Sequence, residues 1–225
     1  MKILFYIQTC KKYSYRREAI ENTFLKRIQH PNEYIFLSNE TILEKNIISF
    51  NVGVDSYELS SLKHLLMLKY LFINKNNFDY YVYTDDDCYI FVNRILNFIN
   101  EIDKQNYNNS ICVCRIGEYN GPGVGNNANV PIKYPGGGAG FIYNNKTLMQ
   151  VCNYLNNENN PPMCNFGDVS YGWWFKNSGG VELIHTELLR PFPPEKEGHT
   201  ELQIYKHLTY HYLQPNDFYN LERYN

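Results

Sequence analysis

The sequence has no hydrophobic run long enough to cross a membrane, which takes about 20 consecutive apolar residues. Its apolar start, MKILFYI, stops at Gln8 and Thr9 and is also short for an export signal. We therefore expect this segment to form a first buried strand. With neither an anchor nor an export signal in this sequence, we expect a protein of the cytoplasm.

Positive charge is also scarce. The 21 lysines and arginines are outnumbered by 23 acidic residues, which gives a net charge of -2. Nucleic-acid-binding domains carry a concentrated basic patch, so we expect no nucleic-acid partner. A GxxxxGK[ST] phosphate loop is missing too, which argues against a phosphotransferase built on that motif. At 225 residues and 44% hydrophobic composition, the chain has material for one large core, and we expect a single domain over residues 1–225.

Cysteine is too rare to form a disulfide scaffold. There are six in the chain, and no CxxC pair suggests a zinc site. Cys112 and Cys114 would point the same way along a strand, where a direct bridge between them would be strained. We expect free thiols in a reducing compartment.

What the sequence does contain is an alternation of strand-like and helical patterns. This alternation predicts an α/β fold with a mostly parallel sheet. The glycine-rich residues 120–140 are expected to form a long loop. The strand-like runs are residues 2–9, 33–38, 47–52, 79–84, 110–116 and 139–144, and the helical patterns are residues 13–28, 58–75 and 145–157.

Three consecutive acids, Asp85, Asp86 and Asp87, end the strand-like run FDYYVYT. Along an extended chain Asp85 and Asp87 point to one side, where their charges repel each other. A divalent cation would remove this repulsion, and carboxylate oxygens suit Mg²⁺ or Mn²⁺. The carboxyl ends of strands in an open α/β sheet are also where ligands bind. The alternative is an acidic turn in which Asp87 caps a helix over YIFVNRILNFINEI.

Six blocks follow one another along the chain in the order found in glycosyltransferase family 31, and each resembles a motif of that family. Its members are inverting β-1,3-glycosyltransferases, Fringe and the core 1 galactosyltransferase among them. The blocks are RREAIENTF (16–24), DSYELSSLKHLLMLKYL (55–71), YYVYTDDDCYIFVN (80–93), YPGGGAGFIYNNKTL (134–148), GDVSYGWW (167–174) and LTYHYLQPNDFYNLE (208–222).

The sequence departs from the family pattern in three ways. Phe24 replaces a tryptophan, and Gly167 replaces the first acid of a Glu-Asp-Val motif. The membrane anchor and stem of the Golgi members are not in this sequence. Either the enzyme acts in the cytoplasm, or the sequence is an excised catalytic domain.

The resemblance implies a GT-A fold, a UDP-sugar donor, a glycan or glycoprotein acceptor and a Mn²⁺ cofactor, with Mg²⁺ as the alternative ion. Asp168 falls on the position of the family's catalytic base. Asp87, His211 and Asp85 fall on its metal-binding positions. We further expect donor binding by Arg16, Arg17, Lys63, Asp85, Asp86, Gly137 and Gly138, and acceptor binding by Tyr134, Trp173 and Trp174.

Each of these assignments has a structural alternative. Asp168 would be a helix cap, and His211 would be packed among tyrosines with His207 as the metal ligand instead. Lys63 would be a solvated surface residue, and Trp173 and Trp174 would belong to the core. The functional alternative is an inactive relative that only binds glycan or nucleotide. Because all three residues essential to the chemistry, Asp87, Asp168 and His211, are present, an active enzyme is favoured.

Overall fold

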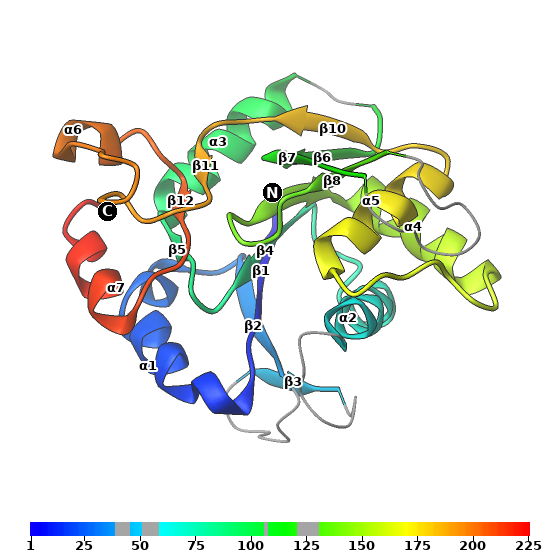
Figure 1. Cartoon of the computed structure of the whole chain (residues 1–225), viewed down its shortest axis with the longest axis horizontal. Helices are drawn as coiled ribbons and strands as arrows, with labels where there is room; N and C mark the ends of the chain where they lie inside the picture. Colours follow the sequence, from blue (N-terminus) through cyan, green and yellow to red (C-terminus); the bar gives the residue numbers. More distant parts are fainter. Residues whose placement is uncertain (39–45, 51–58, 106–107, 121–130) are drawn as a thin grey trace.

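The computed structural model describes residues 1–38, 46–50, 59–105, 108–120 and 131–225 (Figure 1). At its centre is a seven-stranded sheet with the order β10-β6-β9-β4-β1-β2-β3. All neighbours in it are parallel except β9, which runs antiparallel to both β4 and β6. The predicted mostly parallel sheet is therefore confirmed. Its strands are β1 (Ile3–Gln8), β2 (Glu33–Ser38), β3 (Ile47–Ser49), β4 (Tyr80–Asp85), β6 (Ile111–Cys114), β9 (Phe141–Asn144) and β10 (Glu182–His185).

Helices cover both faces of this sheet, and β1 shows why. Ile3, Phe5 and Ile7 belong to the core on one face, and Leu4 and Tyr6 belong to the core on the other. Side chains alternate along a strand, so a strand covered on both faces is a continuous hydrophobic run. On one side lie α2 (Ser60–Asn74), α4 (Asn145–Asn157) and α5 (Gly167–Asn177), and on the other lie α1 (Ser14–Asn22), α3 (Val92–Lys104) and α7 (Pro215–Glu222) (Figure 1).

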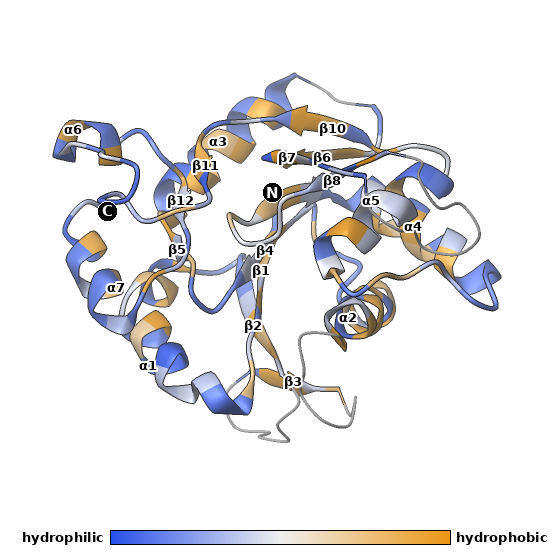
Figure 2. Ribbon diagram, viewed as in Figure 1, coloured by the Kyte–Doolittle hydropathy of each residue, from blue (hydrophilic) through white to orange (hydrophobic). Residues whose placement is uncertain are grey.

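The helices on the surface have two unlike sides, as the colouring of α3 in Figure 2 shows. Its buried residues are Val92, Ile95, Ile99 and Ile102, spaced by three or four. That spacing places them on one stripe of the helix, which packs into the core. Helix α3 begins at Val92 with Phe91 as its N-cap, so the alternative in which Asp87 caps this helix is wrong.

Two small sheets complete the fold and bring distant segments together. Strand β12 (Thr209–Tyr210) lies between β11 (Leu189–Arg190) and β5 (Tyr89–Ile90), and it is antiparallel to β5. Tyr210 pairs with Tyr89, and the backbone N–H of Leu213 donates to the carbonyl of Asp87 at 3.0 Å. This pairing carries His211, just after β12, to the acid run just before β5.

The second small sheet corrects one prediction. Strands β7 (Ile116–Tyr119) and β8 (Ile132–Pro135) pair antiparallel. The glycine-rich stretch is therefore not one long loop, because β8 lies within it. The rest of its length includes residues 121–130, which are outside the described part of the chain, as are residues 51 and 52 of the predicted third strand.

The first predicted helix, residues 13–28, also ends early. Helix α1 stops at Asn22, and a 3-10 helix, η2 (Phe24–Arg27), follows it. Between them the hydroxyl of Thr23 donates to the carbonyl of Ala19 at 2.7 Å. A threonine bonded back to the preceding turn bends or ends a helix, which explains the break. The other connecting elements are η1 (Lys11–Tyr13) and α6 (Glu201–Ile204).

All six cysteines are free thiols, and Cys112 and Cys114 are both buried. The expectation of free thiols is thus confirmed. Across the described ranges, none of the helices has both the length and the apolar character that a membrane crossing requires.

Candidate active site

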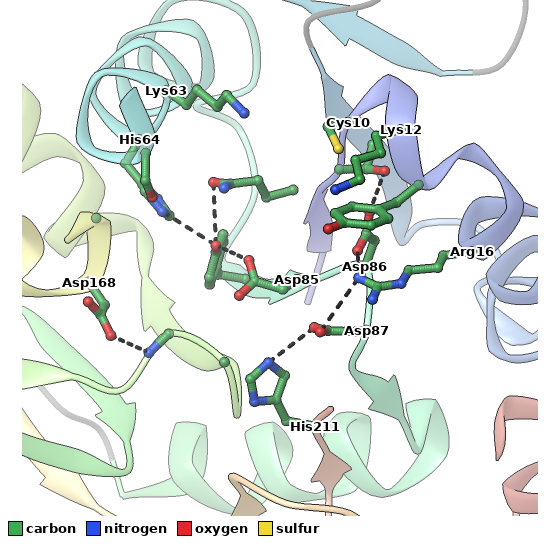
Figure 3. Close-up of a pocket in the computed structure, with 18 of the residues that line it drawn as sticks. Cys10, Lys12, Arg16, Lys63, His64, Asp85, Asp86, Asp87, Asp168 and His211 are labelled. Carbon is green, nitrogen blue, oxygen red and sulfur yellow. Dashed lines mark hydrogen bonds and ion pairs between the residues drawn. The ribbon is translucent and has the colours of Figure 1, made fainter. Parts of the chain in front are cut away.

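A cavity of about 840 Å³ opens at the carboxyl ends of β1 and β4 (Figure 3). This is where an open α/β sheet binds its ligands. Six separate segments of the described part of the chain line the cavity. These supply Gln8 to Tyr13 and Arg16, then Ser60, Lys63 and His64, then Tyr83 and Asp85 to Asp87, then Gly137 and Gly138, then Gly167 and Asp168, and finally His211 and Tyr212.

Asp86 ties the segments after β1 and β4 together. One carboxylate oxygen accepts a hydrogen bond from the Thr9 hydroxyl at 2.7 Å, and the other accepts one from the Arg16 guanidinium at 2.8 Å. Burial raises the pKa of Asp86, and these two hydrogen bonds offset part of the shift. The same guanidinium lies 3.6 Å from Asp87, so Arg16 is held at the edge of the acid run.

Asp85, Asp87 and His211 each offer one ligand atom, and these atoms all lie within 4.8 Å of one another. Burial and then the charge of Asp87 raise the pKa of Asp85 to about 6. The Tyr83 hydroxyl donates to Asp85 at 2.5 Å. Burial opposes ionisation of Asp87, but its hydrogen bond with His211 and the charges of His211 and Arg16 lower its pKa below the ordinary value. Two carboxylates and an imidazole around one point form a donor set that fits Mn²⁺ or Mg²⁺.

A hydrogen bond made by Nδ1 of His211 orients the ring so that Nε2 faces Asp87. Nδ1 donates to the carbonyl of Pro191 at 3.3 Å, while Nε2 lies 3.1 Å from Asp87. A carbonyl on one ring nitrogen is the usual way in which proteins aim the other at a metal. Burial alone would lower the pKa of His211, but its bond with Asp87 and the charges of Asp87 and Asp85 raise it.

The alternative ligand, His207, lies elsewhere. Its ring packs against His199, with 4.5 Å between ring centroids, and its Nδ1 is 3.4 Å from the carbonyl of Gln203. It is not among the described residues of the cavity wall. The geometry therefore favours His211 over His207.

Asp168 lies in the first turn of α5, where Phe166 is the N-cap, so the helix-cap alternative is not what the structure shows. Its two oxygens accept from the backbone N–H of Gly137 at 3.2 Å and of Val169 at 2.8 Å. Burial raises the pKa of Asp168, and these backbone bonds offset part of the shift. A fixed carboxylate with a raised pKa, facing a cavity, has the properties of a general base.

Gly137 and Gly138 form a bridge between Asp168 and His211. A Cβ on Gly137 would lie 3.1 Å from the Cβ of Asp168, and a Cβ on Gly138 would overlap the imidazole of His211. Glycine is thus required at 138 for the histidine to lie where it does. This backbone therefore lies close to two side chains of the protein itself.

Cationic side chains gather on the β1 and α2 side of the cavity. Lys63 is buried, which lowers its pKa, so it is not the solvated surface residue of the alternative reading. Lys11 and Lys12 also line the wall, and the sequence analysis missed them. Like Arg16, they follow β1, so their position in the sequence after the first strand could have indicated them. Arg17 is outside the described cavity wall, and its guanidinium lies 3.4 Å from the carbonyl of Cys10.

The three residues expected to bind the acceptor do not line the cavity in the described part of the chain. Trp174 is fully buried and donates its indole N–H to the carbonyl of Pro162 at 2.7 Å. Trp173 is 4% exposed and packs in a small cluster with Ile132. Both tryptophans therefore follow the core alternative. Tyr134 is partly buried in β8, and burial and then the charge of Asp168 raise its pKa.

His64 is a cavity residue that the sequence analysis did not consider. Burial and then the charge of Lys63 lower its pKa to about 3, so the ring is neutral. Its Nε2 lies 3.4 Å from the Tyr83 hydroxyl. A Cβ on Gly167 would overlap this imidazole. The His64 ring thus occupies the space that an acidic side chain at position 167 would need.

Comparisons with known proteins identify the family and the fold. Residues 1–212 match the model of the Fringe-like family. A crystal structure of a glycosyltransferase involved in the glycosylation of the major capsid of PBCV-1 has a TM-score of 0.57 and 11% identity, over 99% of this chain and 100% of its own. The bifunctional glycosyltransferase WbbM has a TM-score of 0.56 and 9% identity, over 98% of this chain and 49% of its own. No match is found among curated protein sequences.

At such low identity the two structures show the fold alone, and it is the GT-A fold of glycosyltransferases. The family match covers all but the last residues of the chain and includes every residue of the site described above. The chain therefore belongs to the Fringe-like family and is a glycosyltransferase.

Proposed function

We propose that this glycosyltransferase moves a sugar from a UDP-sugar to a hydroxyl of a glycan acceptor, with inversion and with a divalent cation, Mn²⁺ before Mg²⁺. The observation that carries the proposal is one cavity holding two distinct sets of groups. Asp85, Asp87 and His211 converge at one place, and Asp168 faces the same space from α5. The β-1,3 linkage follows the pattern of the family that the chain resembles.

Asp85, Asp87 and His211 are the residues that would hold the cation. When bound, a divalent cation neutralises negative charge on a diphosphate leaving group. A mixed oxygen and imidazole donor set suits Mn²⁺ better than Mg²⁺, which prefers oxygen ligands.

The cationic wall of the cavity supports the donor assignment. Arg16 and Lys63 flank the acid run from α1 and α2, and Lys11 and Lys12 lie on the segment after β1. Diphosphates bind where basic side chains and backbone amides converge. A UDP group in this position would direct its sugar toward the bridge of Gly137 and Gly138.

Asp168 is assigned the proton transfer. Inversion is a single in-line displacement, and it needs one base to take the proton of the acceptor hydroxyl as the bond to the leaving phosphate breaks. The backbone bonds from Gly137 and Val169 fix the carboxylate. Its Oδ2 accepts from the backbone N–H of Gly137 and therefore lies beside the bridge.

The test is an assay of purified protein with a panel of UDP-sugars, with Mn²⁺, with Mg²⁺ and with EDTA. We expect UDP release from at least one donor with Mn²⁺, loss of release with EDTA, and faster release when a glycan acceptor is added. Nuclear magnetic resonance of the product should show the opposite anomeric configuration to the donor. Tight UDP binding without turnover of any donor would instead indicate the binding-only alternative.

A further inference from the structure

Two large aromatic side chains at the mouth of the cavity are exposed to solvent. Tyr212 lines the cavity and is 58% exposed, and Phe192 is 37% exposed. Their rings stack on each other, with centroids 6.0 Å apart and planes at 19°. Most aromatic rings of this chain are buried, so a stacked pair in solvent at the edge of an active site indicates a binding surface.

Both residues of this pair, Phe192 and Tyr212, lie next to groups that contact or position His211. The Tyr212 ring contacts the His211 ring, with 3.9 Å between centroids. Phe192 follows Pro191, whose carbonyl accepts the hydrogen bond of His211 Nδ1. The position of both rings is thus fixed relative to the reacting groups.

The backbone of Tyr212 supports a specific role. Its φ is +60°, in the left-handed region that residues other than glycine, asparagine and aspartate seldom adopt. Strained backbone of this kind persists where the surrounding structure enforces it, and it gathers at ligand sites. Here the next residue, Leu213, is held by its bond to the carbonyl of Asp87. The result is a ring turned outward at the cavity mouth.

The pair lies on the acceptor side of the site. Arg16 and His211 contact different oxygens of Asp87, and Figure 3 shows them on different sides of that carboxylate. The donor diphosphate belongs on the side of Arg16 and the other basic residues. Beyond His211 lie the aromatic pair and, through Gly138 and Gly137, the base Asp168.

We propose that Phe192 and Tyr212 form the acceptor platform, on which a pyranose ring of the glycan stacks with its reacting hydroxyl directed into the cavity. This inference rests on the proposed function and adds the place and the chemical class of the acceptor. A pyranose has an apolar C–H face that packs on an aromatic ring, and its hydroxyls lie at the edge. Lys196 Nζ lies over the Phe192 ring, 4.4 Å from its centroid, so a sugar that stacks on this face displaces the flexible lysine side chain.

The experiment compares two reactions of the same enzyme, donor hydrolysis by water and transfer to a panel of methyl glycopyranosides. We expect Tyr212→Ala and Phe192→Ala each to raise the KM for the glycoside about 10-fold or more. In Phe192→Ala, hydrolysis and Mn²⁺-dependent UDP affinity should stay within about twofold of the parent, because Phe192 is outside the described cavity wall and neither property needs the platform. Tyr212→Phe keeps the ring and should keep transfer, and the exposed Tyr219→Ala, on α7 and outside the described cavity wall, is the matched control.

The outcomes separate the two proposals. A parent enzyme that turns over no donor overturns the proposed function and the platform together. A parent that hydrolyses its donor but accepts no glycoside, or that transfers only to serine or threonine peptides, overturns the platform alone. Equal losses of hydrolysis and transfer in Phe192→Ala, which is not adjacent in sequence to a metal-binding residue, would show a structural role instead.

Discussion

Among single residues, Asp168 is the one whose replacement separates proton transfer from donor binding. Asp168→Asn keeps the size of the side chain and one of its two accepted hydrogen bonds, from Gly137 or from Val169, but removes the ability to take a proton. A positioned general base contributes about 10²–10⁴-fold. We expect kcat for transfer to fall by that amount while UDP affinity, measured by calorimetry with Mn²⁺, stays nearly unchanged. Transfer within about threefold of the parent would leave Asp168 as a structural residue.

His211 and His207 form a natural pair for testing the metal site. His211→Ala should weaken Mn²⁺-dependent UDP affinity by about 10-fold or more, the usual scale for disturbing a metal's surroundings. His207→Ala should change this affinity little, because the His207 ring packs against His199 and is outside the described cavity wall. A reversed order of the two effects would mean that His207 is the ligand.

Some of these residues could be predicted from the sequence, and others could not. Asp85, Asp87, His211 and Asp168 are polar residues in recognisable motifs, and they come together in the structure. The tryptophans were misjudged because α5 is buried around most of its circumference. A helix of that kind has no periodic pattern to show which aromatic ring reaches a cavity.

At the scale of elements, the bridge before β9 sets the position of His211. Gly138→Ala places a methyl group where the imidazole lies, so the ring must move away from Asp87. We expect Mn²⁺-dependent UDP affinity to fall about as far as in His211→Ala, with the melting temperature close to that of the parent.

Gly136→Ala is the matched control for this change. Among the described residues, a Cβ there would meet the carbonyl of Arg115, at 3.1 Å, and a small shift relieves this contact. Affinity should stay within about threefold of the parent. If the two alanine variants behave alike, the bridge does not position the histidine.

The long strands and helices were predictable because each carries its own hydrophobic pattern. The second strand matches its expected bounds, and the helix expected over residues 145–157 is α4. Strand β8 was missed because it is short and its partner β7 lies across a stretch of glycines and asparagines. The pairing of β12 with β5, which brings His211 close to Asp85 and Asp87, joins segments more than a hundred residues apart. No local pattern specifies such a contact.

At the scale of the whole molecule, burying the charge of Asp85 lowers the free energy of unfolding, and the size of this effect depends on pH. The pKa of Asp85 is raised to about 6 in the folded protein, by burial and then by the charge of Asp87, whereas it is about 3.9 in an unfolded chain. The folded state therefore binds this proton more tightly than the unfolded state. The stabilisation is fully present below about pH 4 and is lost as the pH rises through about 6.

Asp85→Asn isolates this contribution, because the amide keeps an acceptor for the Tyr83 hydroxyl but has no charge to bury. In EDTA at pH 7.5 we expect the variant to be more stable than the parent, by a free energy of unfolding on the order of 3 kcal/mol. The difference should shrink as the pH falls through 6 and vanish near pH 4. Urea titrations of both proteins across this range measure it, and a difference that is constant with pH would contradict the assignment.

Adding Mn²⁺ should reverse the ranking at pH 7.5. A ligand that binds only the folded state stabilises it by an amount that grows with the logarithm of the ligand concentration divided by its dissociation constant. The parent offers Asp85, Asp87 and His211 to the ion, whereas the variant lacks one of the two carboxylates. Below pH 5 protons compete for the same oxygens, so the gain from Mn²⁺ should disappear in the parent. Melting curves with and without Mn²⁺ at both pH values test this. Equal stabilisation of parent and variant by the ion would mean that the cation binds elsewhere on the molecule.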